Sequence, residues 1–119
     1  RQEDAIGVAT VAAAELLKAP LVVCFTVSVF TARQVAAYRP GASIFALTTD
    51  VVTYRQLCLV WGVVTGLADH LPSYDQMLAV ARQQIIERGL AVPGDKVVVT
   101  AGVPFDVPGT TNLLKIEAV

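Results

Sequence analysis

The stretch LVVCF, residues 21–25, is an unbroken run of β-branched, aliphatic and aromatic residues with one cysteine. A short run of this kind, without alternating polar residues, is typical of a strand that is buried on both faces of a sheet. Pro20 stands directly before it and ends the segment 3–19, which is rich in alanine and a strong helix former. A helix followed by a doubly buried strand predicts an α/β fold around a parallel sheet.

The rest of the chain continues this alternation of strand and helix. Turn residues and helix caps separate the segments, as expected for βαβ units with right-handed crossovers. The elements predicted are strands at 21–25, 43–48, 62–67 and 96–101, and helices over 3–19, from Phe30 or Thr31 to Arg39, after Thr48-Thr49-Asp50, and from the capping box Ser73-Tyr74-Asp75-Gln76 to Gly89.

The segment 113–119, LLKIEAV, is predicted to be a last strand. Only about ten residues separate it from the strand at 96–101, which is too few for a helical crossover, so the two should pair antiparallel. We therefore predict one α/β domain over 1–119, a three-layer α/β/α sandwich. Its mixed five-stranded sheet should have the order 3-2-1-4-5, with helices on both faces.

Two helical stripes are predicted to face the core. Both have apolar residues at helical spacing, and the two cysteines are expected to be buried, reduced thiols. The stripes are Tyr54, Leu57, Cys58 and Trp61, and Tyr74, Met77, Leu78, Ala81 and Ile85; the cysteines are Cys24 and Cys58.

The composition restricts the class of protein. Hydrophobic residues make up 55% of the chain, charged residues 16%, and the mean hydropathy is +0.61, which suggests a well-covered sheet and an apolar surface for partners. No apolar run reaches the roughly 18 residues of a membrane span. The net charge of −1 gives no electrostatic argument for binding nucleic acid or membranes. With no signal peptide, a cytoplasmic part of a longer polypeptide is expected.

The predicted strand order reverses between the strands at 21–25 and 96–101. Ligands of open parallel sheets bind at such a point, beyond the carboxyl ends of the strands. The loops 26–31 and 102–112 should face each other there, and the first supplies the hydroxyls of Thr26, Ser28 and Thr31 beside a helix start that favours anions. The alternative is that Ser28 and Thr31 only cap the helix and that the loops are plain connections.

The sequence contains no recognisable catalytic motif. It has no Walker loop, no G-x-S-x-G and no Cys/His cluster, and its aspartates stand at caps and turns. His70 has no second His or Cys near it in the sequence and is expected to be a solvated loop residue. A small enzyme of another α/β family would need a catalytic pair that is not found here.

Several motifs resemble one family over nearly the whole chain, the C-terminal domain of pyruvate kinase, with a likeness to its bacterial-type members. They occur in the order and spacing of that family. They are TARQVAAYRPGASIFALTT at 31–49, WGV at 61–63, ERGLAVPGDKVVVTAGVP at 87–104 and PGTTNLLKIEAV at 108–119.

The resemblance implies the same mixed α/β/α fold and a role in glycolysis. The full enzyme transfers a phosphoryl group from phosphoenolpyruvate to ADP with Mg²⁺ and usually K⁺, but its catalytic and metal residues belong to a barrel domain that this chain lacks. The resemblance thus implies an inactive domain without a cofactor of its own. Its partners would be the remainder of the pyruvate kinase chain and the other subunits of a tetramer, whose contacts involve the last strand. In many members the domain also binds an allosteric sugar phosphate or nucleotide.

The resemblance places an effector-phosphate loop at Thr26-Val27-Ser28-Val29-Phe30-Thr31, closed by Pro108, Gly109 and Thr110. The family pattern is T-x-S-G-x-S/T, so Val29 replaces a glycine, and Phe30 stands where members responsive to fructose bisphosphate often have a basic residue. Valine resists positive φ angles and phenylalanine offers no charge-assisted bond to phosphate. The loop 102–112 has Asp106 and no cation. An altered effector loop is therefore predicted; the alternatives are an oligomerisation domain without effector binding and a small phosphometabolite-binding module.

Overall fold

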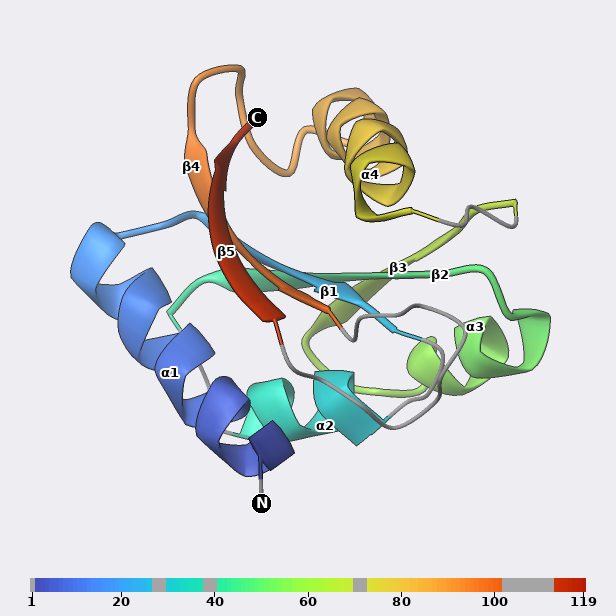
Figure 1. Cartoon of the computed structure of the whole chain (residues 1–119). Helices are drawn as coiled ribbons and strands as arrows, with labels where there is room; N and C mark the ends of the chain where they lie inside the picture. Colours follow the sequence, from blue (N-terminus) through green and yellow to red (C-terminus); the bar gives the residue numbers. More distant parts are fainter. Residues whose placement is uncertain (1, 27–29, 38–40, 70–72, 102–112) are drawn as a thin grey trace.

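A mixed five-stranded sheet with the strand order β3-β2-β1-β4-β5 forms the centre of the structure, a computed structural model that describes residues 2–26, 30–37, 41–69, 73–101 and 113–119 (Figure 1). The predicted order and the antiparallel pairing of the last strand are confirmed. The strands are β1 (Leu21–Phe25), β2 (Ser43–Thr48), β3 (Val63–Leu67), β4 (Lys96–Ala101) and β5 (Leu113–Ala118), and the helices are α1 (Gln2–Leu17), α2 (Phe30–Ala37), α3 (Val51–Leu57) and α4 (Tyr74–Glu87).

Strand β1 is the central strand, and all five of its residues are buried. It pairs in parallel with β2 on one side and with β4 on the other, so that Phe25 is opposite both Leu47 and Ala101. Both edges of the strand are thus hydrogen-bonded and both faces are covered. This is the environment that an uninterrupted apolar run predicts.

The helices lie on both faces of the sheet, as predicted, but unevenly. Figure 1 shows α4 on one side and α1, α2 and α3 on the other. Right-handed crossovers explain this division, because the chain steps in one direction from β1 through β2 to β3 and then returns across the sheet to β4. The side chains of β1 divide accordingly: Leu21, Val23 and Phe25 join the core under α4, and Val22 and Cys24 join the other core.

Helices α1 and α4 end in the same way with different residues. In α4 the N–H of Leu90 donates to the carbonyl of Ile85 at 3.0 Å, and Gly89 between them has φ +67°. In α1 the N–H of Ala19 donates to the carbonyl of Ala14 at 3.0 Å, and Lys18 takes the left-handed position with φ 52°. This Schellman turn ends α1 at Leu17, two residues before the predicted end.

The prediction that Trp61 and Cys58 belong to a buried stripe is wrong. Helix α3 ends at Leu57 with Cys58 as its cap, and the N–H groups of Leu59 and Val60 then bond three residues back in a tighter turn. Trp61 therefore lies beyond the helix with 88% of its surface exposed, and Cys58 is exposed as well. Leu57 is buried as predicted. Both cysteines are free, and Cys24 is buried.

Side chains from β2 and α4 pack very closely against β3 at Gly66. A Cβ atom added there would lie 2.5 Å from Oε1 of Gln84, 2.8 Å from Cζ of Phe45 and 3.0 Å from Cδ1 of Leu47. Only a residue without a side chain fits without displacing the core. A glycine that weakens the strand pattern in the sequence is thus required by the side chains of Phe45, Leu47 and Gln84 that pack over it.

We expect Gly66→Ala to lower the free energy of unfolding by about 1–3 kcal/mol, because the added methyl group overpacks this contact. Urea denaturation of the two proteins would measure the loss. Gly41→Ala is the matched control, since a Cβ at Gly41 meets no atom within 4 Å. Equal stability of the two variants would contradict this account of Gly66.

Candidate functional site

The parallel strands β1, β2, β3 and β4 all end at one edge of the sheet, where the sequence predicts a site. Because Phe25 pairs with Ala101, the segments that follow β1 and β4 leave the sheet from neighbouring positions. The order of the strands reverses between these two strands. The starting points of the two predicted loops are therefore adjacent, as a switch-point site requires.

The described part of the first predicted loop is limited to its two ends. Thr26 is half-buried, and its N–H donates to the carbonyl of Leu47 at 3.1 Å. Phe30 and Thr31 form the first turn of α2, whose amino end thus lies at the carboxyl edge of the sheet. The other residues named for the site lie outside the described residues, so the effector loop stays a prediction: Val27, Ser28, Val29, Pro108, Gly109 and Thr110.

The polar residues after β2 serve the local structure. Asp50 is the N-cap of α3, as its position predicts: its Oδ2 accepts from the N–H of Thr53 at 3.0 Å and from the Thr53 hydroxyl at 2.6 Å. These hydrogen bonds, the one from the hydroxyl first, lower the pKa of the Asp50 carboxyl. The Thr48 hydroxyl accepts from the N–H of Asp50 at 3.1 Å. This carboxylate is therefore engaged in capping.

An open cavity of about 500 Å³, which no sequence pattern indicated, lies at the same edge between the ends of β2 and β3 and helix α4. Among the described residues that line it, only Asp69 is charged, and a carboxylate does not favour a phosphate. The cavity could not be predicted from a motif because three separate segments form it. Its lining consists of Thr49, Val51, Leu67, Ala68, Asp69, Val80 and Gln84.

The described residues do not assemble a metal or nucleophile site. No group of three or more His, Cys, Asp or Glu side chains that could hold a metal ion occurs among them. Burial raises the pKa of the Cys24 thiol to about 11, so this cysteine is a neutral core residue rather than a nucleophile. The exposed Cys58 has its sulfur 3.3 Å from the Thr65 hydroxyl. His70 lies outside the described residues.

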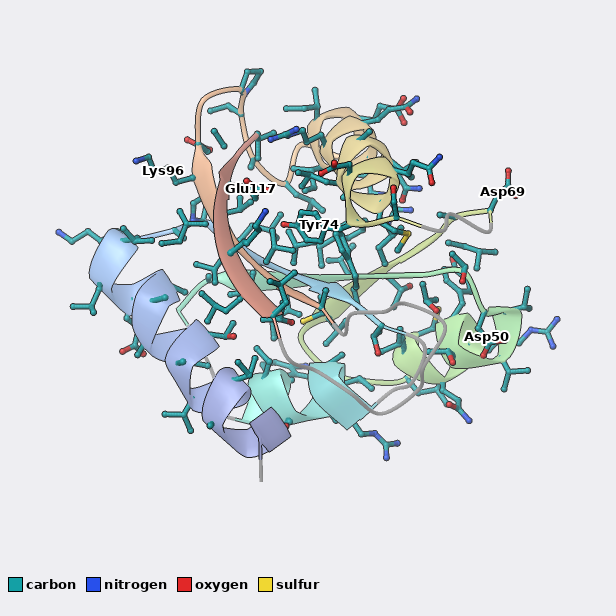
Figure 2. The ribbon with its side chains drawn as sticks, viewed as in Figure 1. Asp50, Asp69, Tyr74, Lys96 and Glu117 are labelled. Atoms are coloured by element: carbon teal, nitrogen blue, oxygen red, sulfur yellow. The ribbon has the colours of Figure 1, made fainter. Side chains whose placement is uncertain are left out.

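A polar cluster joins α4 to strand β5. Figure 2 shows Tyr74 and Glu117 pointing toward each other, and the Tyr74 hydroxyl donates to Oε2 of Glu117 at 3.0 Å. The Lys115 ammonium lies 4.9 Å from the centre of the Tyr74 ring, and the Phe25 ring centre lies 5.6 Å from it. Arg82 adds a bond from Nε to the carbonyl of Ala118 at 3.0 Å. The cluster fixes the last strand against the helix.

We expect Tyr74→Phe to change how stability depends on alkaline pH. Burial first, and then the hydrogen bond and charge of Glu117, raise the pKa of the Tyr74 hydroxyl. The unfolded chain ionises this tyrosine near pH ~10 while the folded protein keeps the proton. The contribution of Tyr74 to stability is therefore complete below pH ~10 and falls as the pH rises further.

Urea denaturation at pH 8 and pH 11 measures this effect. At pH 8 the free energy of unfolding of Tyr74→Phe should be about 0.5–1.5 kcal/mol lower than that of the parent, because one hydrogen bond is lost. From pH 8 to pH 11 the variant should lose less stability than the parent. Tyr54→Phe on α3 controls for the loss of one hydroxyl elsewhere. If the free energy of unfolding changes by the same amount between pH 8 and pH 11 in the parent and in Tyr74→Phe, Tyr74 is not the source of this pH dependence.

The structure is that of an α/β/α domain whose strand order reverses between the parallel strands β1 and β4. We find no catalytic site among its described residues. None of its described helices is long and apolar enough to cross a membrane. The family model described as "Pyruvate kinase, alpha/beta domain" matches residues 4–117. The chain therefore belongs to the pyruvate kinase α/β domain family, and its resemblance to that family is confirmed.

Individual relatives agree with this assignment. The chain is 44% identical over 116 residues to a pyruvate kinase of Geobacillus stearothermophilus, an alignment that covers 98% of this chain and 20% of the relative. A pyruvate kinase of Agrobacterium vitis is 45% identical over 112 residues, which covers 92% of this chain and 24% of the relative. A pyruvate kinase of Clostridium acetobutylicum is 39% identical over 116 residues, which covers 98% of this chain and 24% of the relative. The chain thus spans about a fifth to a quarter of the length of these relatives.

Proposed function

We propose that this chain acts as the C-terminal α/β domain of a cytoplasmic pyruvate kinase, an enzyme that forms pyruvate and ATP from phosphoenolpyruvate and ADP. The observation that carries the proposal is the match to the Geobacillus stearothermophilus pyruvate kinase. The two are 44% identical, and the alignment covers 98% of this chain but only 20% of that enzyme. The catalytic residues, with Mg²⁺ and K⁺, would belong to the remainder of the pyruvate kinase chain.

The complete polypeptide should form pyruvate from phosphoenolpyruvate and ADP in the presence of Mg²⁺ and K⁺, and the 119-residue chain alone should not. A coupled assay that follows pyruvate reduction measures both, with a reaction lacking ADP as the blank. Pyruvate formation by the 119-residue chain above that blank would contradict the proposal, as would an inactive complete polypeptide.

Within that enzyme we assign the domain a role in assembly. Strand β5 is an edge strand with one neighbour, β4, and its free edge can pair with a second copy of the chain. The exposed side chain of Ile116 on this strand adds apolar surface for such a contact. The tetramer implied by the family resemblance would use this edge.

We also assign the segment 26–31 as an altered effector loop. Support comes from the amino end of α2, which follows β1 at the carboxyl edge of the sheet, since the N–H groups of a helix start favour an anion. Val29 and Phe30 replace residues that would suit a phosphate, and Asp106 adds a like charge. The domain should accordingly discriminate against sugar bisphosphates.

Calorimetry of the complete enzyme with fructose 1,6-bisphosphate, glucose 6-phosphate, ribose 5-phosphate and AMP tests this assignment. We expect weak or no binding of the bisphosphate by the parent. The double variant Val29→Gly, Phe30→Arg should bind it at least about tenfold more tightly, because one charge-assisted hydrogen bond contributes about 1.5–3 kcal/mol.

Adding Ser28→Ala to the double variant is the control and should reverse the gain. Tight binding of fructose 1,6-bisphosphate by the parent would show that the loop is intact rather than altered. A double variant that binds no better than the parent would remove the loop from consideration as an effector site.

A further inference from the structure

Strand β3 forms the edge of the sheet opposite to β5, and in the described part of the chain β2 is its one neighbour. The N–H of Ala68, directly after β3, donates to the carbonyl of Thr48 on β2 at 2.9 Å. Because the backbone polar groups of successive residues in a strand point to alternate sides, those of Thr65 and Leu67 point away from β2. Such an edge is a template on which a strand of another molecule can pair.

Two side chains from helix α4 occupy this edge. Nε2 of Gln84 donates to the carbonyl of Leu67 at 3.2 Å, and the guanidinium of Arg88, the C-cap residue of α4, donates to the carbonyl of Thr65. Residues at positions i and i+4 lie on the same side of a helix, so Gln84 and Arg88 reach successive outward carbonyls of one strand. They take the positions in which the N–H groups of a further strand would bind.

The core beneath the edge fixes both side chains. Gln84 crosses β3 at Gly66, where an added Cβ would lie 2.5 Å from its Oε1, so a side chain at this position would obstruct its path. Cζ of Arg88 lies 5.5 Å from the centre of the Phe45 ring on β2. At that distance a guanidinium is attracted to an aromatic face. The two edge contacts therefore depend on a glycine and an aromatic ring in neighbouring strands.

We propose that Gln84 and Arg88 close the β3 edge against strand pairing with a second copy of the chain. A strand that paired there would displace both side chains and would bury the Arg88 guanidinium without its acceptor, which is unfavourable. All the contacts lie within this chain, so the edge is closed whether or not the proposed function holds.

The two outer edges of the sheet differ in this respect. On β5 the α4 residue Arg82 bonds the carbonyl of Ala118, which is the last residue of the strand. Pairing along the earlier residues of β5 would leave that bond in place. On β3 the two covered carbonyls belong to Thr65 and Leu67, in the middle and at the end of a five-residue strand. Closure of β3 thus directs pairing between copies to β5.

Sedimentation velocity of the complete polypeptide, over a range of concentrations, tests the proposal. The double variant Gln84→Ala, Arg88→Ala should form particles of at least about twice the mass of the parent particle, because two equal edges can then pair across a twofold axis. Circular dichroism establishes that the variant is folded. If it is not, Arg88→Ala alone replaces it with the same expectation, since Arg88 is an exposed residue.

A matched control removes the same kinds of side chain from other places. Arg55 on α3 and Gln83 on α4 are exposed, and Gln83 bonds the Glu87 side chain rather than the sheet. The double variant Arg55→Ala, Gln83→Ala should therefore sediment like the parent. Equal association of the two double variants would show that the loss of polar surface, and not the opening of β3, causes it.

A rescue variant separates strand pairing from association through unfolding. Val64 is 37% exposed on β3, and a lysine on an edge strand opposes pairing. Adding Val64→Lys to the Gln84→Ala, Arg88→Ala variant should restore the mass of the parent particle. The proposal is overturned if the double variant keeps the parent mass at all concentrations, or if its association persists after Val64→Lys.

Discussion

Strand β1 contacts protein on all four sides: β2 and β4 along its edges, and a layer of helix on each face. Its backbone polar groups are paired within the sheet and its side chains alternate between two separate cores. Neither a polar side chain nor a second conformation can be accommodated there at low cost. Every other element is positioned by reference to this strand, since α2, α3 and α4 are the crossovers that let its neighbours run parallel to it.

This central burial leaves the two ends of the sheet and its outer edges for function. The carboxyl end has the starts of the two loops that follow β1 and β4, and the amino end has the exposed Trp61. The outer strand β5 is joined to α4 by Tyr74, which bonds Glu117, and by Arg82, which bonds the carbonyl of Ala118. The proposed effector loop and the proposed subunit contact therefore fall in separate regions of one small domain.

The strands at 21–25, 43–48 and 96–101 agree with the predictions to the residue, because apolar runs bounded by prolines, glycines and caps are local signals. The caps Asp50 and Ser73 were predictable for the same reason: a side-chain oxygen and an N–H two or three residues on are neighbours in any helix start. Helical spacing failed at Trp61, because a stripe shows which face residues share only while the helix continues.

For the candidate site, the sequence alone identified the hydroxyls in the loop after β1 and the valine that replaces a glycine there. The structure showed that the ends of β1 and β4 are adjacent. The strand order was also predicted correctly, because a chain of this alternation has few common doubly wound orders to choose from. Only the tertiary structure decided the rest: that the core packed over β3 needs Gly66, that Tyr74 reaches Glu117, 43 residues away, and that Trp61 lies at the surface. The physical reason is that these depend on how closely distant segments approach, and a local pattern contains no information about such distances.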